Sequence, residues 1–166
     1  TTLFRSQVGG GALASSVIQA FSMAKTAGLI SELPRFHAVQ TSNAHPLARA
    51  WRALVTADGD LDRARQHRSE YMWPWESEPK SIATGILDDE TYDWFSIVTG
   101  LQESGGDVVT VSEERLAEAQ VLSQKHTGIA ASATCTAGME GLFEMRKRGE
   151  VHDSERCAVL LTGAIR

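Results

Sequence analysis

Three consecutive glycines near the start of the chain, Gly9, Gly10 and Gly11, most constrain what this sequence can fold into. They follow a short apolar segment, Leu3 to Val8. They precede a segment, Leu13 to Ala27, whose apolar residues recur at spacings of three and four. This pattern predicts a strand, a tight turn and a helix. Glycine lets the backbone approach a ligand closely, and a helix start offers free N–H groups and a positive dipole end. The turn is therefore a candidate phosphate site.

The rest of the chain continues this alternation of strands and helices, apart from a long connection at 57–79. Such alternation favours an α/β fold in which a parallel sheet carries crossover helices on both faces, in three layers. The length of 166 residues fits one α/β domain, residues 1–166. Further strands are predicted at Phe36 to Gln40, Asp107 to Val111 and Ala158 to Gly163. Further helices are predicted at Pro46 to Val55 with Asn43 as N-cap, at Tyr92 to Thr99, from Ser112 as N-cap to His126, and at Thr134 to Lys147.

Composition excludes several classes of function. The net charge of −5 argues against nucleic acid as a partner. No apolar run approaches the roughly 18 residues that a membrane span requires. The histidines show no metal spacing, and the acidic residues from Asp88 to Asp93 are interpreted as a solvated turn. Cys135 and Cys157 fit no metal or redox spacing, so we expect buried thiols in a cytoplasmic protein.

The glycine turn also indicates what kind of phosphate it could hold. It matches neither the dinucleotide fingerprint nor the P-loop, and no lysine lies near it, which argues against a nucleoside triphosphate. Backbone amides at a helix start suit a compact phosphate monoester instead. At the far end of the chain, Thr162 closes the last predicted strand. Its hydroxyl could donate to, or accept from, a heterocyclic nitrogen. Ligands of parallel sheets collect at the carboxyl ends of the strands, where both features are expected.

The segment Gln7 to Ser16 resembles the phosphate loop of the pyridoxal-phosphate enzymes of the tryptophan-synthase β fold. Within that group, threonine synthase and its relatives are the most similar. Later segments follow in the same order as in those enzymes, so the resemblance spans nearly the whole chain. These segments are Arg35 to Gln40 with Ala44 to Leu47, Ser81 to Ile86, Glu103 to Glu114, Thr127 to Gly149, and Leu160 to Gly163.

This resemblance implies pyridoxal 5′-phosphate as the cofactor and an amino acid as the substrate. The backbone of the glycine turn would wrap the phosphate, Thr162 would bind the pyridine nitrogen, and Gly85 would lie near the ring. A hydroxyl partner leaves that nitrogen unprotonated, which suits elimination and replacement at the β or γ carbon. The implied cofactor-binding residues are Gly9, Gly10, Gly11, Ala12, Leu13, Gly85 and Thr162.

The Schiff-base lysine of that group has no counterpart here. In the family it lies in the N-terminal half, in a Ser-Phe/Tyr-Lys type of motif, and none of Lys25, Lys80, Lys125 and Lys147 follows such a motif. We therefore expect this chain to be the C-terminal half of such an enzyme, inactive without the missing N-terminal half. The sheet edge left uncovered would favour a homodimer.

Two other interpretations stay open at this point. The first is a non-catalytic α/β module that holds a phosphate-bearing ligand at the glycine turn and regulates a partner. The second is a Rossmann-like nucleotide binder. The second is weakened because the third glycine of the fingerprint is missing and because Gln40 is followed by Thr41 and Ser42 rather than by an acidic residue.

Overall fold

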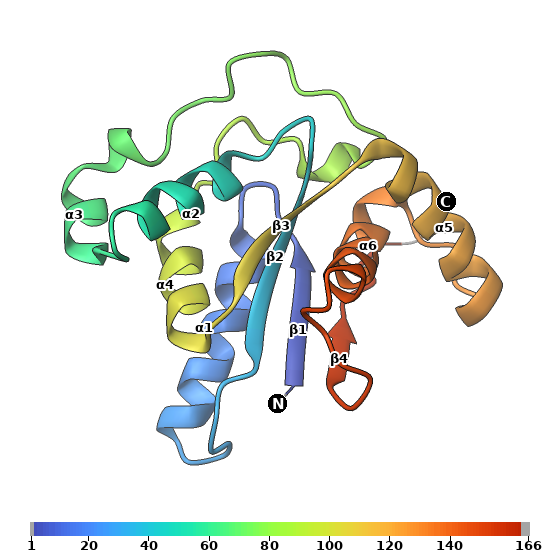
Figure 1. Cartoon of the computed structure of the whole chain (residues 1–166), viewed down its shortest axis with the longest axis horizontal. Coiled ribbons are helices and arrows are strands. Elements are labelled where there is room, and N and C mark those ends of the chain that lie inside the picture. The colour runs from blue at the N-terminus through green and yellow to red at the C-terminus, as the bar shows by residue number, and fades with distance from the viewer. Residues whose placement is uncertain (1, 164–166) are drawn as a thin grey trace.

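Four parallel strands form the centre of the molecule: β1 (Thr2–Gln7), β2 (Arg35–Thr41), β3 (Asp107–Val111) and β4 (Arg156–Val159). The strand order is β3-β2-β1-β4, and each neighbouring pair runs parallel. This computed structural model describes residues 2–163, so Thr1 and residues 164–166 lie outside the described part of the predicted domain. Helices cover both faces of the sheet (Figure 1), which confirms the predicted three-layer α/β fold.

The two helical layers differ in their makeup. One face carries the first four α-helices, and the other carries the last two (Figure 1). The first layer consists of α1 (Ala12–Thr26), α2 (Pro46–Thr56), α3 (Leu61–Gln66) and α4 (Trp94–Ser104). The second consists of α5 (Glu113–Thr127) and α6 (Ala133–Lys147). Two single-turn 3-10 helices, η1 (Arg68–Glu70) and η2 (Thr84–Ile86), lie between α3 and α4.

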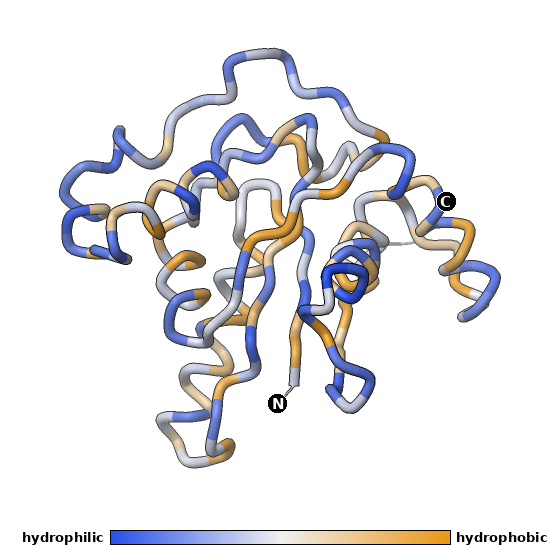
Figure 2. The backbone as a smooth tube through the Cα atoms, in the orientation of Figure 1, coloured by the Kyte–Doolittle hydropathy of each residue, from blue (hydrophilic) through white to orange (hydrophobic). Residues whose placement is uncertain are grey.

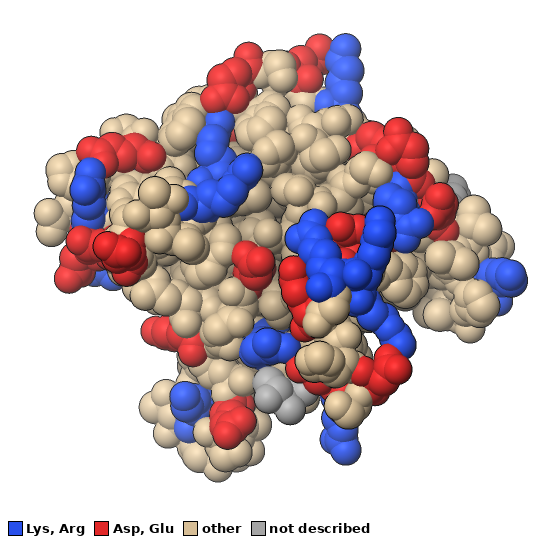
Figure 3. All heavy atoms as spheres, in the orientation of Figure 1, with Lys and Arg blue, Asp and Glu red and all other residues tan. Residues whose placement is uncertain are grey.

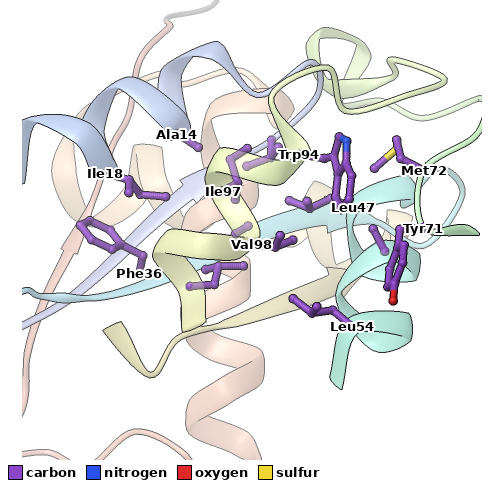
Figure 4. Packing of buried hydrophobic residues seen from close by; sticks show 14 of the residues in the cluster. Ala14, Ile18, Phe36, Leu47, Leu54, Tyr71, Met72, Trp94, Ile97 and Val98 are labelled. Atoms are coloured by element: carbon purple, nitrogen blue, oxygen red, sulfur yellow. The ribbon is translucent and has the colours of Figure 1, made fainter. Parts of the chain in front are cut away.

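Aromatic packing dominates the core on the α1 face. Phe4 of β1, Phe36 of β2 and Phe21 of α1 form a triangle with ring centroids 5.7 to 5.9 Å apart. Farther along, Trp94 at the start of α4 stacks on Tyr71 of the long connection, with ring centroids 6.1 Å apart (Figure 4). This contact anchors the connection, which has little regular structure of its own, to the domain.

The α6 face is lined instead by aliphatic side chains from alternate strand positions, such as Leu3 and Val39. Gly141 lets α6 approach the sheet, because a Cβ atom there would lie 2.4 Å from a methyl carbon of Val39. Hydrophobic colour gathers on the strands at the centre of the molecule, while α5 and α6 carry hydrophobic and hydrophilic residues intermixed (Figure 2).

Most predicted elements are confirmed within one or two residues, but the last strand is not. We predicted Ala158 to Gly163, whereas β4 ends at Val159. Its pairing with β1 stops where Arg5 lies opposite Val159. Beyond that point the chain turns toward the start of α6, where the Ser132 amide donates to the Gly163 carbonyl at 3.2 Å. Thr162 therefore lies on a loop after the strand rather than at its end.

Two helix predictions also need correction. Asn43 does not cap α2, because His45 occupies the N-cap position. The Asn43 side-chain amide instead donates to the Lys80 carbonyl at 2.9 Å, which ties the chain just after the long connection to the loop that follows β2. The helix predicted at Tyr92 to Thr99 begins at Trp94 and continues to Ser104, because Leu101 belongs to the buried core and extends its apolar face. By contrast, Ser112 caps α5 as predicted.

Surface charges of both signs are interspersed over the face shown in Figure 3. Arg63 pairs with Glu70 at 3.0 Å, and Arg68 pairs with Glu90. Within residues 2–163, no helix is long and apolar enough to cross a membrane. Of the two cysteines, Cys135 is buried as expected, whereas Cys157 is exposed because it lies on β4, an edge strand of the described sheet.

Candidate functional site

A cavity of about 510 Å³ opens at the carboxyl ends of β1 and β4. Its walls come from five places that are distant in sequence: the glycine turn with the start of α1, the η2 segment, the residues just before α4, the start of α6 and the loop after β4. The loop after β2 contributes none of the described lining residues. All residues assigned to a cofactor in the sequence line this one cavity, namely Gly9, Gly10, Gly11, Ala12, Leu13, Gly85 and Thr162.

Three hydrogen bonds hold the glycine turn from the side of the protein core. The Thr91 hydroxyl donates to the Gly9 carbonyl at 2.9 Å, and the Asp93 amide donates to the Gly10 carbonyl at 3.1 Å. The side-chain amide of Gln40 donates to the Val8 carbonyl at 3.2 Å. Both Thr91 and Gln40 are fully buried. The carbonyl groups of the turn are therefore satisfied, and the conformation of the turn is fixed before any ligand binds.

The backbone N–H groups of the same turn, by contrast, have no hydrogen-bond acceptors in the described part of the chain. Within residues 2–163, the N–H groups of Gly9, Gly10 and Gly11 donate to no acceptor. Ala12 and Leu13 begin α1, so their N–H groups also lack partners within the helix. A set of fixed, unpaired amide donors at the positive end of a helix dipole is suited to bind a phosphate.

Glycine is required at two positions of the turn. A Cβ atom at Gly9 would lie 2.2 Å from an Asp88 carboxylate oxygen and 2.9 Å from the Ile86 Cα. Gly11, the N-cap of α1, has a φ of +104°, in the left-handed region where other residues are strained. A Cβ atom there would also lie 2.9 Å from the Ile97 side chain. The turn thus leaves no room for side chains on its core side.

Side chains rather than backbone groups form the other end of the cavity. The Gln7 amide Nε2 donates to the Thr162 hydroxyl oxygen at 2.7 Å. The Cys135 sulfur lies 3.6 Å from the same oxygen and accepts a hydrogen bond from the Ser132 hydroxyl at 3.3 Å. Thr162 is thus held between β1 and α6, and it lines the cavity.

Gly85 forms a side wall, where η2 meets the start of α6. Its amide donates to the Thr134 hydroxyl at 3.0 Å, and a Cβ atom on Gly85 would lie 3.0 Å from the Thr134 methyl carbon. The close fit explains why a glycine stands here. Both residues line the cavity between its two ends.

The charges at the cavity are few and acidic. Among the described lining residues, Asp93 is the only carboxylate, and there is no lysine, arginine or histidine. The Asp93 carboxylate accepts a hydrogen bond from the Ser15 hydroxyl at 2.8 Å. Tyr92 also lines the cavity, and the carboxylate of Asp89 raises the pKa of its phenol, which therefore stays neutral near pH 7. Each of the four lysines is exposed, and none is part of the wall.

Sequence reasoning missed several residues of this site, including Gln7, Tyr92, Asp93 and Thr134. Asp93 was assigned to a solvated acidic turn, whereas its side chain is half-buried against the start of α1. The start of a predicted helix close to Asp93 was the one local signal that could have given it a structural role. Gln7 and Thr134 carry no local signal, because their roles arise from contacts with Thr162 and Gly85.

A family profile described as pyridoxal-phosphate dependent enzyme matches residues 2–163. The chain therefore belongs to this family, as the resemblance predicted, and the cofactor of the family is pyridoxal phosphate. The fold is that of solved members of the group. A threonine deaminase from T.th. superimposes with a TM-score of 0.68 at 20% identity, over 99% of this chain and 50% of that one. An L-serine ammonia-lyase from Rhizomucor miehei superimposes with a TM-score of 0.69 at 18% identity, over 99% of this chain and 45% of that one.

The curated relatives are named threonine synthase. The chain is 25% identical to the threonine synthase of Methanocaldococcus jannaschii over 156 residues, which are 94% of this chain and 35% of that protein. It is 34% identical to the threonine synthase of Halalkalibacterium halodurans over 87 residues, 52% of this chain and 24% of that protein. The chain thus spans about a third or less of the length of these relatives.

The cavity fits pyridoxal phosphate in part. Its volume of about 510 Å³ falls within the usual range for a small-molecule site. The unpaired amides of the glycine turn match the phosphate, and the Thr162 hydroxyl matches a ring nitrogen. No lysine in the described part of the chain lies at the cavity, so these residues fit the cofactor as a non-covalent ligand only.

Proposed function

We propose that this chain supplies the cofactor-binding part of a pyridoxal-phosphate-dependent lyase or synthase that acts on an amino acid. The reaction would be an elimination or replacement at the β or γ carbon, as in a threonine synthase. The observation that carries the proposal is the convergence of the glycine turn, Gly85 and Thr162 on one cavity. Chance would not be expected to gather these three features on one wall, because the glycine turn and Thr162 are about 150 residues apart in sequence.

Each end of the cavity has its own task in this proposal. The amides of Gly10 to Leu13 hold the phosphate, and the buried braces Thr91 and Gln40 keep those amides in position. Thr162 holds the ring nitrogen. When bound, the cofactor supplies an electron sink for bond breaking next to the amino group of a substrate. Because the nitrogen faces a hydroxyl and not a carboxylate, the sink would be a weak one.

The complete enzyme needs a lysine that the described residues do not bring to the cavity. We propose that another part of the protein, or a second polypeptide, carries that lysine and covers the open side of the cavity. Leu13 and Tyr92 at the cavity wall are 41% and 66% exposed, which supports a covered state.

The proposed assembly is a cytoplasmic homodimer that binds neither nucleic acid nor membrane. Cys135 and Cys157 are both free thiols, which is compatible with a reducing compartment. Light scattering of the chain over a range of concentrations tests self-association, and a monomer at all concentrations would contradict it.

Titration of the chain with pyridoxal phosphate, followed by its visible absorbance, tests the binding proposal. We expect saturable binding that inorganic phosphate weakens by competition. Pyridoxal without its phosphate is the matched control and should bind much more weakly, because the amide donors then have no partner. Equal binding of the two compounds would place the affinity outside the glycine turn and contradict the proposal.

A second candidate is the non-catalytic module that binds a phosphate-bearing ligand and regulates a partner. The exposure of all four lysines favours it for the chain alone. Borohydride reduction in the presence of pyridoxal phosphate separates the two candidate functions. We expect no stoichiometric covalent product from this chain by itself. A full enzyme that contains the same chain and is trapped at one lysine would favour the catalytic proposal, and a full protein that binds the cofactor without trapping would favour the module.

A further inference from the structure

Gln7, the last residue of β1, is placed unusually for a glutamine. Its side chain enters the buried space between the sheet and α6, and only 6% of the residue is exposed. Its Oε1 atom lies beside Gly138 of α6, where a Cβ atom would be at an ordinary contact distance of 3.7 Å from it. An apolar residue of similar size would satisfy the packing at this position, so the amide group calls for a separate explanation.

Only one of the two polar atoms of this side-chain amide makes a hydrogen bond within the described residues. Its Nε2 atom donates to the Thr162 hydroxyl oxygen at 2.7 Å. Its Oε1 atom is buried and accepts no hydrogen bond within residues 2–163. Leaving a buried acceptor unpaired costs about 1–3 kcal/mol, and such groups are often found at functional sites. The contact with Thr162 is therefore retained at a cost to stability.

This contact determines where the Thr162 proton can point. A hydroxyl has one proton to donate, and the oxygen of Thr162 already accepts from Gln7. The proton can go to the Cys135 sulfur at 3.6 Å or into the cavity. Sulfur is a weak acceptor, and this one already accepts from the Ser132 hydroxyl at 3.3 Å. The cavity is the better destination.

We infer that Gln7 is a positioning residue that turns the Thr162 hydroxyl proton into the cavity, so that the site selects a ligand nitrogen without a proton. The inference rests on the proposed binding of pyridoxal phosphate with its ring nitrogen at Thr162. A neutral ring nitrogen accepts the Thr162 proton, whereas a protonated one would face a second donor. Gln7 thus holds the cofactor in its weaker electron-accepting form without touching it.

No other described group takes over this role. The titratable side chains near the cavity are Tyr92 and Asp93, which precede α4, Cys135 on α6, and Asp88, whose carboxylate lies beside Gly9 and Gly10 at the glycine end. Asp93 bonds to Ser15 at the glycine end of the cavity. Within the described residues no carboxylate or cation makes a hydrogen bond with Thr162, so the direction of its proton depends on Gln7.

The test uses pyridoxal phosphate labelled with ¹⁵N at the ring nitrogen, bound to the full chain and titrated with pH by NMR. In the unmodified chain we expect the bound nitrogen to stay unprotonated to a lower pH than in the free cofactor. Gln7→Met keeps the size but removes the donor, and Gln7→Glu makes the partner accept the Thr162 proton. We expect the proton affinity of the ring nitrogen to rise about threefold in the first and about tenfold or more in the second.

Gln19→Glu on the exposed side of α1 is the matched control for added charge and should leave the titration unchanged. An unchanged ring titration in Gln7→Met would overturn the inference even if Gln7→Glu failed to fold. A bound nitrogen that is protonated in the unmodified chain would overturn it too, because the amide would then face Thr162 with its oxygen. Absence of any bound resonance would refute the proposed function itself, and this inference with it.

Discussion

The two ends of the cavity are built in different ways. At the phosphate end, the hydrogen-bond donors offered to the ligand would be consecutive backbone amides, from Gly10 to Leu13. At the ring end, it would meet the side chain of Thr162, whose position depends on Gln7 and Cys135 from other elements. The first end needs particular backbone conformations, and the second needs particular side chains. Substitutions at the two ends should therefore impair the site in different ways.

Gly11→Ala should give the largest effect, because it strains the backbone conformation on which the phosphate end depends. Alanine at a φ of +104° is strained, and its Cβ would crowd Ile97 and Thr91 at 2.9 and 3.1 Å. We expect a loss of about 3 kcal/mol in unfolding free energy, from the left-handed conformation and the overlap together, measured by chemical denaturation.

Gly28→Ala is the matched control for this change. Gly28 has a φ of +73° but nothing within 4 Å of the position of a Cβ, so alanine there meets only the backbone cost, about 1 kcal/mol. Equal losses in the two variants would mean that the glycine turn is not crowded by its neighbours.

Thr162→Val should come next and should separate the two ends. It removes the hydroxyl that faces the ring and leaves the Gln7 amide without its acceptor. We expect the affinity for pyridoxal phosphate to fall about tenfold, as for one lost hydrogen bond, while the affinity for inorganic phosphate is unchanged. Thr162→Ser, which keeps the hydroxyl, should restore most of the loss. An equal fall for both ligands would show that the ends are not independent.

Asp93→Asn should give the smallest effect, and in the opposite direction. The Asp93 carboxylate lines the cavity next to the start of α1, where it opposes a bound phosphate by charge repulsion. We expect the affinity for phosphate to increase about two- to fivefold at low salt, with the gain shrinking as salt is added. Asp62→Asn, on the exposed surface of α3, should change nothing. Weaker binding in Asp93→Asn would mean that its bond to Ser15 matters more than its charge.

The difference between the ends also explains what could be predicted from the sequence. The phosphate end is contiguous, and its glycines mark both the turn and the close approach, so each of its residues could be named from the sequence; all of them line the cavity, and phosphate binding there stays a prediction. The alternation of strands and helices gave the three-layer fold in the same way. Thr162 was predicted through a family resemblance, but its place on a loop beyond β4 was not, because the pairing of Ser132 with Gly163 is a tertiary contact.

The supporting residues were beyond sequence reasoning for a related reason. Gln7 looks like an ordinary strand end, and its role exists only because a residue 155 positions away folds against it. Asp93 belongs to an acidic run that looks solvated, yet it is half-buried at the start of α1. In both cases the signal lies in the packing of distant elements, which neither composition nor periodicity records.

A crystal structure of the chain with pyridoxal phosphate tests the central claim most directly, since that claim is that one cavity holds both ends of the cofactor. We expect the phosphate on the amides of Gly10 to Leu13 and the ring nitrogen within hydrogen-bond distance of the Thr162 hydroxyl. A phosphate bound away from the glycine turn, or a ring that points away from Thr162, would contradict the claim.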